Sequence, residues 1–308
     1  MRPPDAMRLD IPSAPGSAVP PAEPSRHVFP NLRQTFLLLI LFLGFTLLAA
    51  FVLSPLQGAL SRQAWFLLVV LAGEGMGVLV GLRLARWPLR QVLATLGFST
   101  RTLGWLLVIG FGNLLLIGSL LYAITRLFGP TEQAYLVELF TVKNAGQFLI
   151  LFVTIAVAAP LLEELLLRGI LLRGLTLNRG AWAGVLWSAF FFAVIHLNPL
   201  QAAPAFVNGV VWALVLLRTG SLGTTLFLHS LNNGFVFLLV QLSLLAARTG
   251  RHVEPGAVSP LAGALVALGM ALVGLWLVRT GLRQLPRAPL RLAAMWGVST
   301  EIATSRVV

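Results

Sequence analysis

The sequence contains no cysteine and few charged residues, and both absences narrow the classes of protein it can belong to. Without cysteine, disulfides, cysteine-ligated metals and thiol nucleophiles are excluded. Charged residues make up 10% of the 308 residues, against about 25% in typical globular domains. With 57% hydrophobic residues and a mean hydropathy of +0.89, the chain is too apolar to cover a water-facing surface. A soluble enzyme is therefore excluded, and a polytopic membrane protein is predicted.

Acidic residues are scarcer than basic ones, which gives the chain a formal net charge of +12. Every basic residue except Lys143 is an arginine. In a soluble domain such a charge would suggest nucleic acid as a partner. Here the arginines separate apolar runs instead of clustering with aromatic residues, so we expect membrane lipids as partners and no nucleic acid.

Long apolar runs dominate the rest of the sequence, and strand-like alternation is absent. A spanning helix needs about 20 mostly apolar residues, and lipid tolerates only helices or closed barrels. We therefore predict an all-α bundle of about eight transmembrane helices. The candidate spans are residues 35–57, 64–86, 102–125, 146–167, 181–197, 204–218, 221–242 and 259–278.

Three regions are expected along the chain. Residues 1–33 hold eight of the eighteen prolines and too little apolar surface to fold, so a disordered cytoplasmic tail is predicted. Residues 34–280 form the transmembrane domain, with the first span retained as a signal anchor. Residues 281–308 are expected to be a basic cytoplasmic tail.

The distribution of basic residues predicts the orientation. If the N-terminus lies inside, seventeen of the 22 basic residues lie on the cytoplasmic side and five on the outer side. The positive-inside rule favours this arrangement, with both termini in the cytoplasm. We expect an integral protein of a bacterial inner membrane.

A few ionisable and amide side chains interrupt the apolar spans, where each is a functional hypothesis because such groups are costly in lipid. Glu74 lies between glycines in the second span, where packing or pairing is the plainer interpretation. The others lie in the fourth, fifth and seventh spans: Glu163, Glu164, Arg168, His196, His229, Asn232 and Asn233.

Helical spacing suggests how the acidic pair is used. Glu164 and Arg168 are four residues apart and share a helix face, so Arg168 is expected to neutralise Glu164 and leave Glu163 aimed elsewhere. An interhelical ion pair without catalytic function is the structural alternative. If the fourth and fifth spans are antiparallel about the turn near Gly180, Glu163 and His196 lie at the same depth.

His229 and Asn233 are also four residues apart, and together with Glu163 and His196 they form a set with defined chemistry. A glutamate and a histidine can deprotonate a water, and a second histidine and an amide can stabilise the oxyanion that forms at a carbonyl. Hydrogen bonding between helices is the alternative for His229 and Asn233. Glu163, His196 and His229 would be the ligands of a zinc ion if the chemistry were metal-dependent, but no HExxH motif is present.

These residues resemble a known family. Glu163-Glu164-x3-Arg168, Phe192-x3-His196 and His229-x3-Asn233 are similar to the EExxxR, FxxxH and HxxxN motifs of the CPBP family of intramembrane proteases, which includes CAAX prenyl proteases and bacteriocin-processing proteins. The resemblance covers about residues 146–242. It implies an intramembrane endopeptidase, of glutamate type or metallo-type, with a polar chamber open toward the cytoplasm. It also implies that Glu163 and His196 activate water, that His229 and Asn233 stabilise the oxyanion, and that Glu164 and Arg168 support the site.

The favoured mechanism requires no cofactor, with zinc as the alternative. The expected substrate is a peptide or a membrane-anchored protein. Two other functions fit the same residues: a non-catalytic scaffold or bacteriocin-immunity factor of the same fold, and a transporter whose Glu and His relay protons. Substrate, cleavage site and oligomeric state are not predicted by the sequence.

Overall fold

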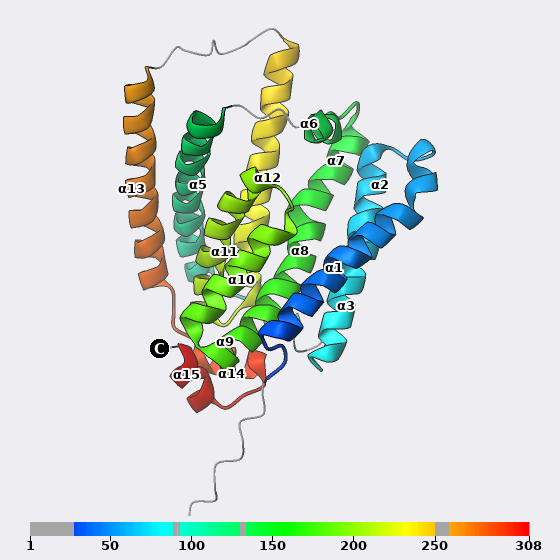
Figure 1. Ribbon diagram of the computed structural model, residues 1–308. Coiled ribbons are helices and arrows are strands. Elements are labelled where there is room, and N and C mark those ends of the chain that lie inside the picture. The colour runs from blue at the N-terminus through cyan, green and yellow to red at the C-terminus, as the bar shows by residue number, and fades with distance from the viewer. Residues whose placement is uncertain (1–27, 89–90, 92, 130–133, 250–258, 308) are drawn as a thin grey trace, which may run out of the picture.

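A computed structural model describes residues 28–88, 91, 93–129, 134–249 and 259–307. In these ranges every regular element is a helix, which confirms the predicted all-α bundle (Figure 1). Most of the predicted proline-rich tail, residues 1–27, lies outside the described residues. Residues 28–31 of that predicted tail are described and lead directly into the first helix.

The helices follow the predicted spans closely. They are α1 (Leu32–Val52), η1 (Ser54–Gly58), α2 (Arg62–Val69), η2 (Val70–Glu74), α3 (Gly75–Leu84), α5 (Thr100–Phe128), α6 (Ala134–Phe140), α7 (Ala145–Val153), η3 (Thr154–Ala158), α8 (Ala159–Glu164), η4 (Leu165–Leu172), α9 (Arg173–Arg179), α10 (Ala181–Ile195), α11 (Pro199–Thr219), α12 (Leu222–Arg248), α13 (Pro260–Gln284), α14 (Pro289–Trp296) and α15 (Thr300–Val307).

Seven continuous helical stretches of the described chain are long and apolar enough to cross a membrane. The predicted fifth span is the exception, because α10 has only 15 residues. At about 1.5 Å per residue it is shorter than a hydrocarbon core of about 30 Å. The helix ends where Leu197 adopts a left-handed backbone with φ 50°, directly before Asn198 and Pro199.

Local signals in the sequence explain where the helices begin and turn. Asn31 caps α1 in a capping box with Gln34, and Asn144 caps α7 through its side chain. Gly180, with φ 86°, makes the predicted turn between α9 and α10, a conformation that glycine adopts at little cost. Beyond this turn Gly184 lies directly against Thr176, so the two helices run antiparallel and closely packed.

The core lies where η4, α10 and α11 meet. Leu166, Leu171, Phe191 and Trp212 are at most 1% exposed there, and η4 and α11 both contact α10. Elsewhere the spans present apolar side chains outward, as on α13, where Trp276 is 63% exposed. Such a surface suits lipid, so the packed core and its polar residues lie inside a lipid-facing shell.

The C-terminal segment, expected as a basic tail, folds against one end of the bundle (Figure 1). Leu292, Met295 and Trp296 of α14 are each 1% exposed. Arg173 of α9 donates to the Trp296 carbonyl oxygen from Nε at 2.9 Å and from Nη2 at 2.8 Å. Residues 289–307 therefore cover one end of the bundle as two short helices.

Candidate active site

The acidic pair lies on one long helical stretch, residues 145–179, which contains two π-helical segments. η3 precedes α8, and η4 follows directly after Glu164 and includes Arg168. A third π-helical segment, η2, ends at Glu74. In a π-helical turn the backbone hydrogen bonds join residues five apart instead of four, and such turns occur frequently at functional sites. η2 and η4 each contain an ionisable residue of this candidate site, and η3 supplies a backbone carbonyl to Asn233.

Glu164 and Arg168 form the ion pair that the sequence predicts. Arg168 Nη1 lies 3.1 Å from Glu164 Oε1, and both side chains are fully buried. The guanidinium also lies over two aromatic rings, 4.6 Å from the centre of Phe192 and 5.3 Å from that of Trp212. These faces stabilise a cation that has few hydrogen-bond acceptors around it. Phe192 is the first residue of the Phe192-x3-His196 motif, so that motif carries an electrostatic role as well as an apolar one.

His229 lies between both glutamates. Its Nδ1 is 3.0 Å from Glu164 Oε1, and its Nε2 is 3.4 Å from Glu163 Oε2. The ring stacks on Trp212 with centres 4.2 Å apart, which fixes its plane. Spacing alone placed His229 with Asn233. The structure places it at the centre of the acidic pair, with Glu163 side chain 14% exposed and Glu164 fully buried.

His196 lies at the end of α10 and is held by its own helix. Its Nδ1 is 2.8 Å from the Phe192 carbonyl oxygen, and since a carbonyl only accepts, Nδ1 must donate. In the neutral ring Nε2 then carries the lone pair that a base needs. The Phe192 ring separates the histidines, with centres 5.0 Å from His196 and 5.3 Å from His229. The partner described for Glu163 is His229, whereas the sequence placed His196 at its level.

Asn233 lies one turn along α12 from His229. Its Nδ2 donates to the Ile155 carbonyl oxygen at 3.1 Å, and its Oδ1 accepts from Asn232 at 3.2 Å. Ile155 belongs to η3, so a π-helical segment supplies the acceptor that orients this amide. Sequence reasoning identified Asn233 but not this contact, because the acceptor is a backbone group.

One side chain that lies at this site was not identified from the sequence, and another was identified without a role in the site. Trp212 of α11 stacks on His229 and lies near Arg168, yet an apolar residue in an apolar span gives no signal. Glu74 was interpreted as a packing or pairing group. It lies close enough to Glu163 for their charges to interact, and its segment η2 contacts α8. Its Oε2 is buried and has no hydrogen-bond partner among the described residues.

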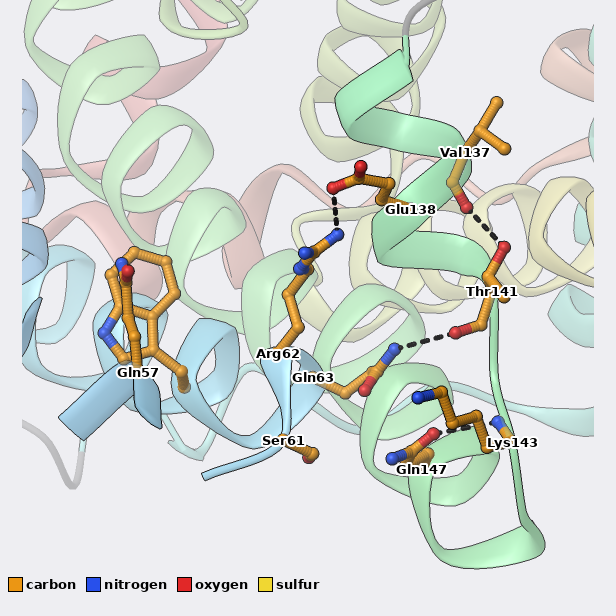
Figure 2. Close-up of a pocket in the computed structure, with 10 residues that line it drawn as sticks. Gln57, Ser61, Arg62, Gln63, Val137, Glu138, Thr141, Lys143 and Gln147 are labelled. Carbon is orange, nitrogen blue, oxygen red and sulfur yellow. Dashed lines mark hydrogen bonds and ion pairs between the residues drawn. The ribbon is translucent and has the colours of Figure 1, made fainter. Parts of the chain in front are cut away.

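One cavity described in the bundle lies away from these residues. It measures about 750 Å³ and lies between α2, α6 and the start of α7. Figure 2 shows Arg62 paired with Glu138 and Gln63 bonded to Thr141 across it. Neither this cavity nor two smaller ones, near Asn178 and near Gln91, is lined by the motif residues.

The donor geometry does not fit a zinc site. Across the described residues, no three His, Asp or Glu side chains are arranged to hold one metal ion. Of the three expected ligands, His196 binds the Phe192 carbonyl oxygen through Nδ1, and the Phe192 ring lies between the two histidines.

Comparison with known proteins agrees with the motifs. Residues 145–235 match the family model described as type II CAAX prenyl endopeptidase Rce1-like. The matched segment contains all of the motif residues: Glu163, Glu164, Arg168, Phe192, His196, His229 and Asn233. Glu74 lies outside it. No curated protein and no solved structure matches the chain.

Proposed function

Because residues 145–235 match the type II CAAX prenyl endopeptidase Rce1-like model, we propose that the chain is an intramembrane endopeptidase. Its substrate is a peptide or a membrane-anchored protein. One observation carries the proposal: Glu163, the more accessible acid, lies 3.4 Å from His229 beside a fully buried Glu164–Arg168 pair. Because the two acids lie in contrasting environments, Glu163 suits the role of the reacting group and Glu164 that of a supporting group.

Glu163 and His196 activate the water in this mechanism. Glu163 takes a proton from the water while the water oxygen bonds to the carbonyl carbon of the substrate. The tautomer of His196, with Nδ1 donating to Phe192, supports its role as an acceptor at Nε2. When the intermediate collapses, the carbon–nitrogen bond breaks and the proton passes to the leaving nitrogen.

His229 and Asn233 stabilise the oxyanion. An Nε2–H of His229 would donate to the oxyanion in place of Glu163. The Asn233 Nδ2 carries two hydrogens, of which one binds the Ile155 carbonyl, so the other is available to the substrate. Glu164 and Arg168 keep the His229 ring in place from the buried side.

Glu163→Ala and His196→Ala test the mechanism. Each is expected to lower cleavage by at least about 100-fold, the usual contribution of an acid–base group. The readouts are a membrane peptide profile of cells carrying each variant and turnover of a quenched farnesylated CAAX peptide by the purified protein. Glu138→Ala, at an exposed carboxylate in the cavity between α2, α6 and α7, serves as the control. If the protein were a scaffold or immunity factor, both variants would retain its function. That result would contradict the proposed peptidase activity.

Metal dependence is tested separately. Because the donor geometry does not fit zinc, incubation with a strong chelator followed by desalting is expected to leave turnover unchanged. The measurement is the initial rate before and after treatment. A loss of activity that zinc restores would contradict the metal-independent mechanism while leaving the peptidase function in place.

A further inference from the structure

Glu74 is a half-buried acid that the mechanism above does not use. It lies at the end of η2, whose helical turn packs against α8, the element that ends in Glu163 and Glu164. Its Oε2 is shielded from solvent without a hydrogen-bond partner among the described residues, and its charge interacts with that of Glu163. A buried carboxylate oxygen without a donor is costly unless a proton or a transient partner satisfies it.

The segment around Glu74 is fixed by close backbone packing. A Cβ on Gly73 would lie 2.5 Å from the Thr46 Cα, and one on Gly77 would lie 2.8 Å from Phe42. These two glycines, four residues apart, hold η2 and α3 against α1 in the small-residue packing that is common in membranes. Glu74 is therefore placed by its backbone, and the described part of the chain gives its Oε2 no polar partner that would explain it as a structural pairing group.

Charge balance indicates the state in which Glu74 is stable. Arg168 compensates Glu164, and His229 contacts both Glu163 and Glu164. Ionising Glu74 as well would place another negative charge beside Glu163 in a low-dielectric site. Two neighbouring carboxyl groups avoid this repulsion when one stays protonated and donates to the other.

We propose that Glu74 is a positioning residue whose protonated carboxyl donates a hydrogen bond to Glu163. This bond holds one Glu163 oxygen and leaves the other directed at His229 and the reacting water. The pairing rests on the packing of η2 against α8 and on the shielded Oε2 of Glu74, and its effect on catalysis rests on the proposed function. The hydrogen bond involves no net chemical change, because the proton stays between the two carboxyl groups.

Infrared spectroscopy of the purified protein in detergent tests the pairing without any substrate. The wild type is expected to show the carbonyl stretch of a protonated carboxyl. Glu74→Gln should remove that band, Glu163→Gln should shift it, and Glu138→Gln, at an exposed carboxylate paired with Arg62, should leave it unchanged. A spectrum in which Glu74→Gln changes nothing would overturn the pairing.

Kinetics with the quenched farnesylated CAAX peptide test the positioning role. Glu74→Gln keeps a donor, so kcat should stay within about threefold of wild type. Glu74→Ala should lower kcat by about tenfold or more while KM changes less than about twofold. Equal kcat for Glu74→Ala and wild type, with an unchanged gel-filtration profile, would overturn the positioning role. A wild type that cleaves nothing contradicts the proposed function, while the infrared band still decides the pairing.

Discussion

Arg168 is fully buried, and Glu164 is its ion-pair partner in the described part of the chain. None of its three nitrogens makes a hydrogen bond in the described structure, so Coulomb attraction to Glu164 and the faces of Phe192 and Trp212 compensate for its desolvation. Both aromatic faces suit the planar guanidinium better than an ammonium group. The EExxxR spacing thus places Glu164 and Arg168 on one helix face and also lets their charges compensate each other.

Replacing Arg168 tests that balance. Arg168→Ala leaves Glu164 as an uncompensated buried charge, and losses of about 3–5 kcal/mol are typical of such changes. Arg168→Lys is expected to recover only part of the loss, because the aromatic faces no longer match the cation. Thermal unfolding of the purified protein in detergent provides the measurement.

The exposed ion pair between Arg62 and Glu138 is the matched control, since it joins the same side-chain types at 46% and 60% exposure. Arg62→Ala is expected to cost at most about 1 kcal/mol. Equal unfolding midpoints for Arg62→Ala and Arg168→Ala would show that burial does not decide the contribution of these pairs.

At the scale of helices, close packing of α1 against η2 and α3 sets the position of Glu74. A Cβ at Gly73 would meet the backbone of Thr46 at 2.5 Å, whereas one at Gly75 would meet nothing within 4 Å. The two glycines are two residues apart in the same helical stretch, so helix propensity favours alanine at both. Only their packing differs.

Gly73→Ala is therefore expected to destabilise the protein by about 1–3 kcal/mol, because α1 and η2 must separate. Activity should fall with it, since Glu74 moves together with its segment. Gly75→Ala should leave unfolding and turnover near the wild-type values. Both are compared by thermal unfolding and peptide turnover, and equal behaviour of the two variants would contradict the packing argument.

Sequence patterns predicted most elements of this fold because apolar length and turn residues act locally. Most spans begin within three residues of a helix start, and the turn at Gly180 is where the spacing placed it, but the fourth span ends at residue 167 while its helical stretch continues to Arg179. The π-helical segments were not predicted, because they depend on packing against other helices. For the same reason, the sequence identified His229 but not its place between Glu163 and Glu164.

Over the whole molecule, the described start of the chain and its C-terminal helices meet at one end of the bundle (Figure 1). Asn178 donates to the Val28 carbonyl oxygen at 2.6 Å, and Arg173 binds the carbonyls of Phe29 and Trp296. Composition alone predicted a tail for residues 281–308, because the arginines and prolines of this segment lower its average hydropathy although α14 contains apolar residues. Those residues become buried only once α9 and α11 provide a surface.

The same-side arrangement leads to a prediction about orientation. The positive-inside rule places the end that carries α14 and α15 in the cytoplasm, and the junction between α12 and α13 outside. Since the chain has no cysteine, single-cysteine variants can be labelled without any background. Ser305→Cys in α15 and Ser259→Cys at the start of α13 are both at exposed positions.

A membrane-impermeant maleimide applied to intact spheroplasts is expected to label Ser259→Cys and to spare Ser305→Cys. Permeabilised cells should label both, which controls for the reactivity of each position. Labelling of Ser305→Cys alone in intact spheroplasts would reverse the orientation, and labelling of both would contradict a membrane between the two ends. Because seventeen of the 22 basic residues lie on the predicted inner side, reversing the bundle would require the translocation of most of the charge in the chain.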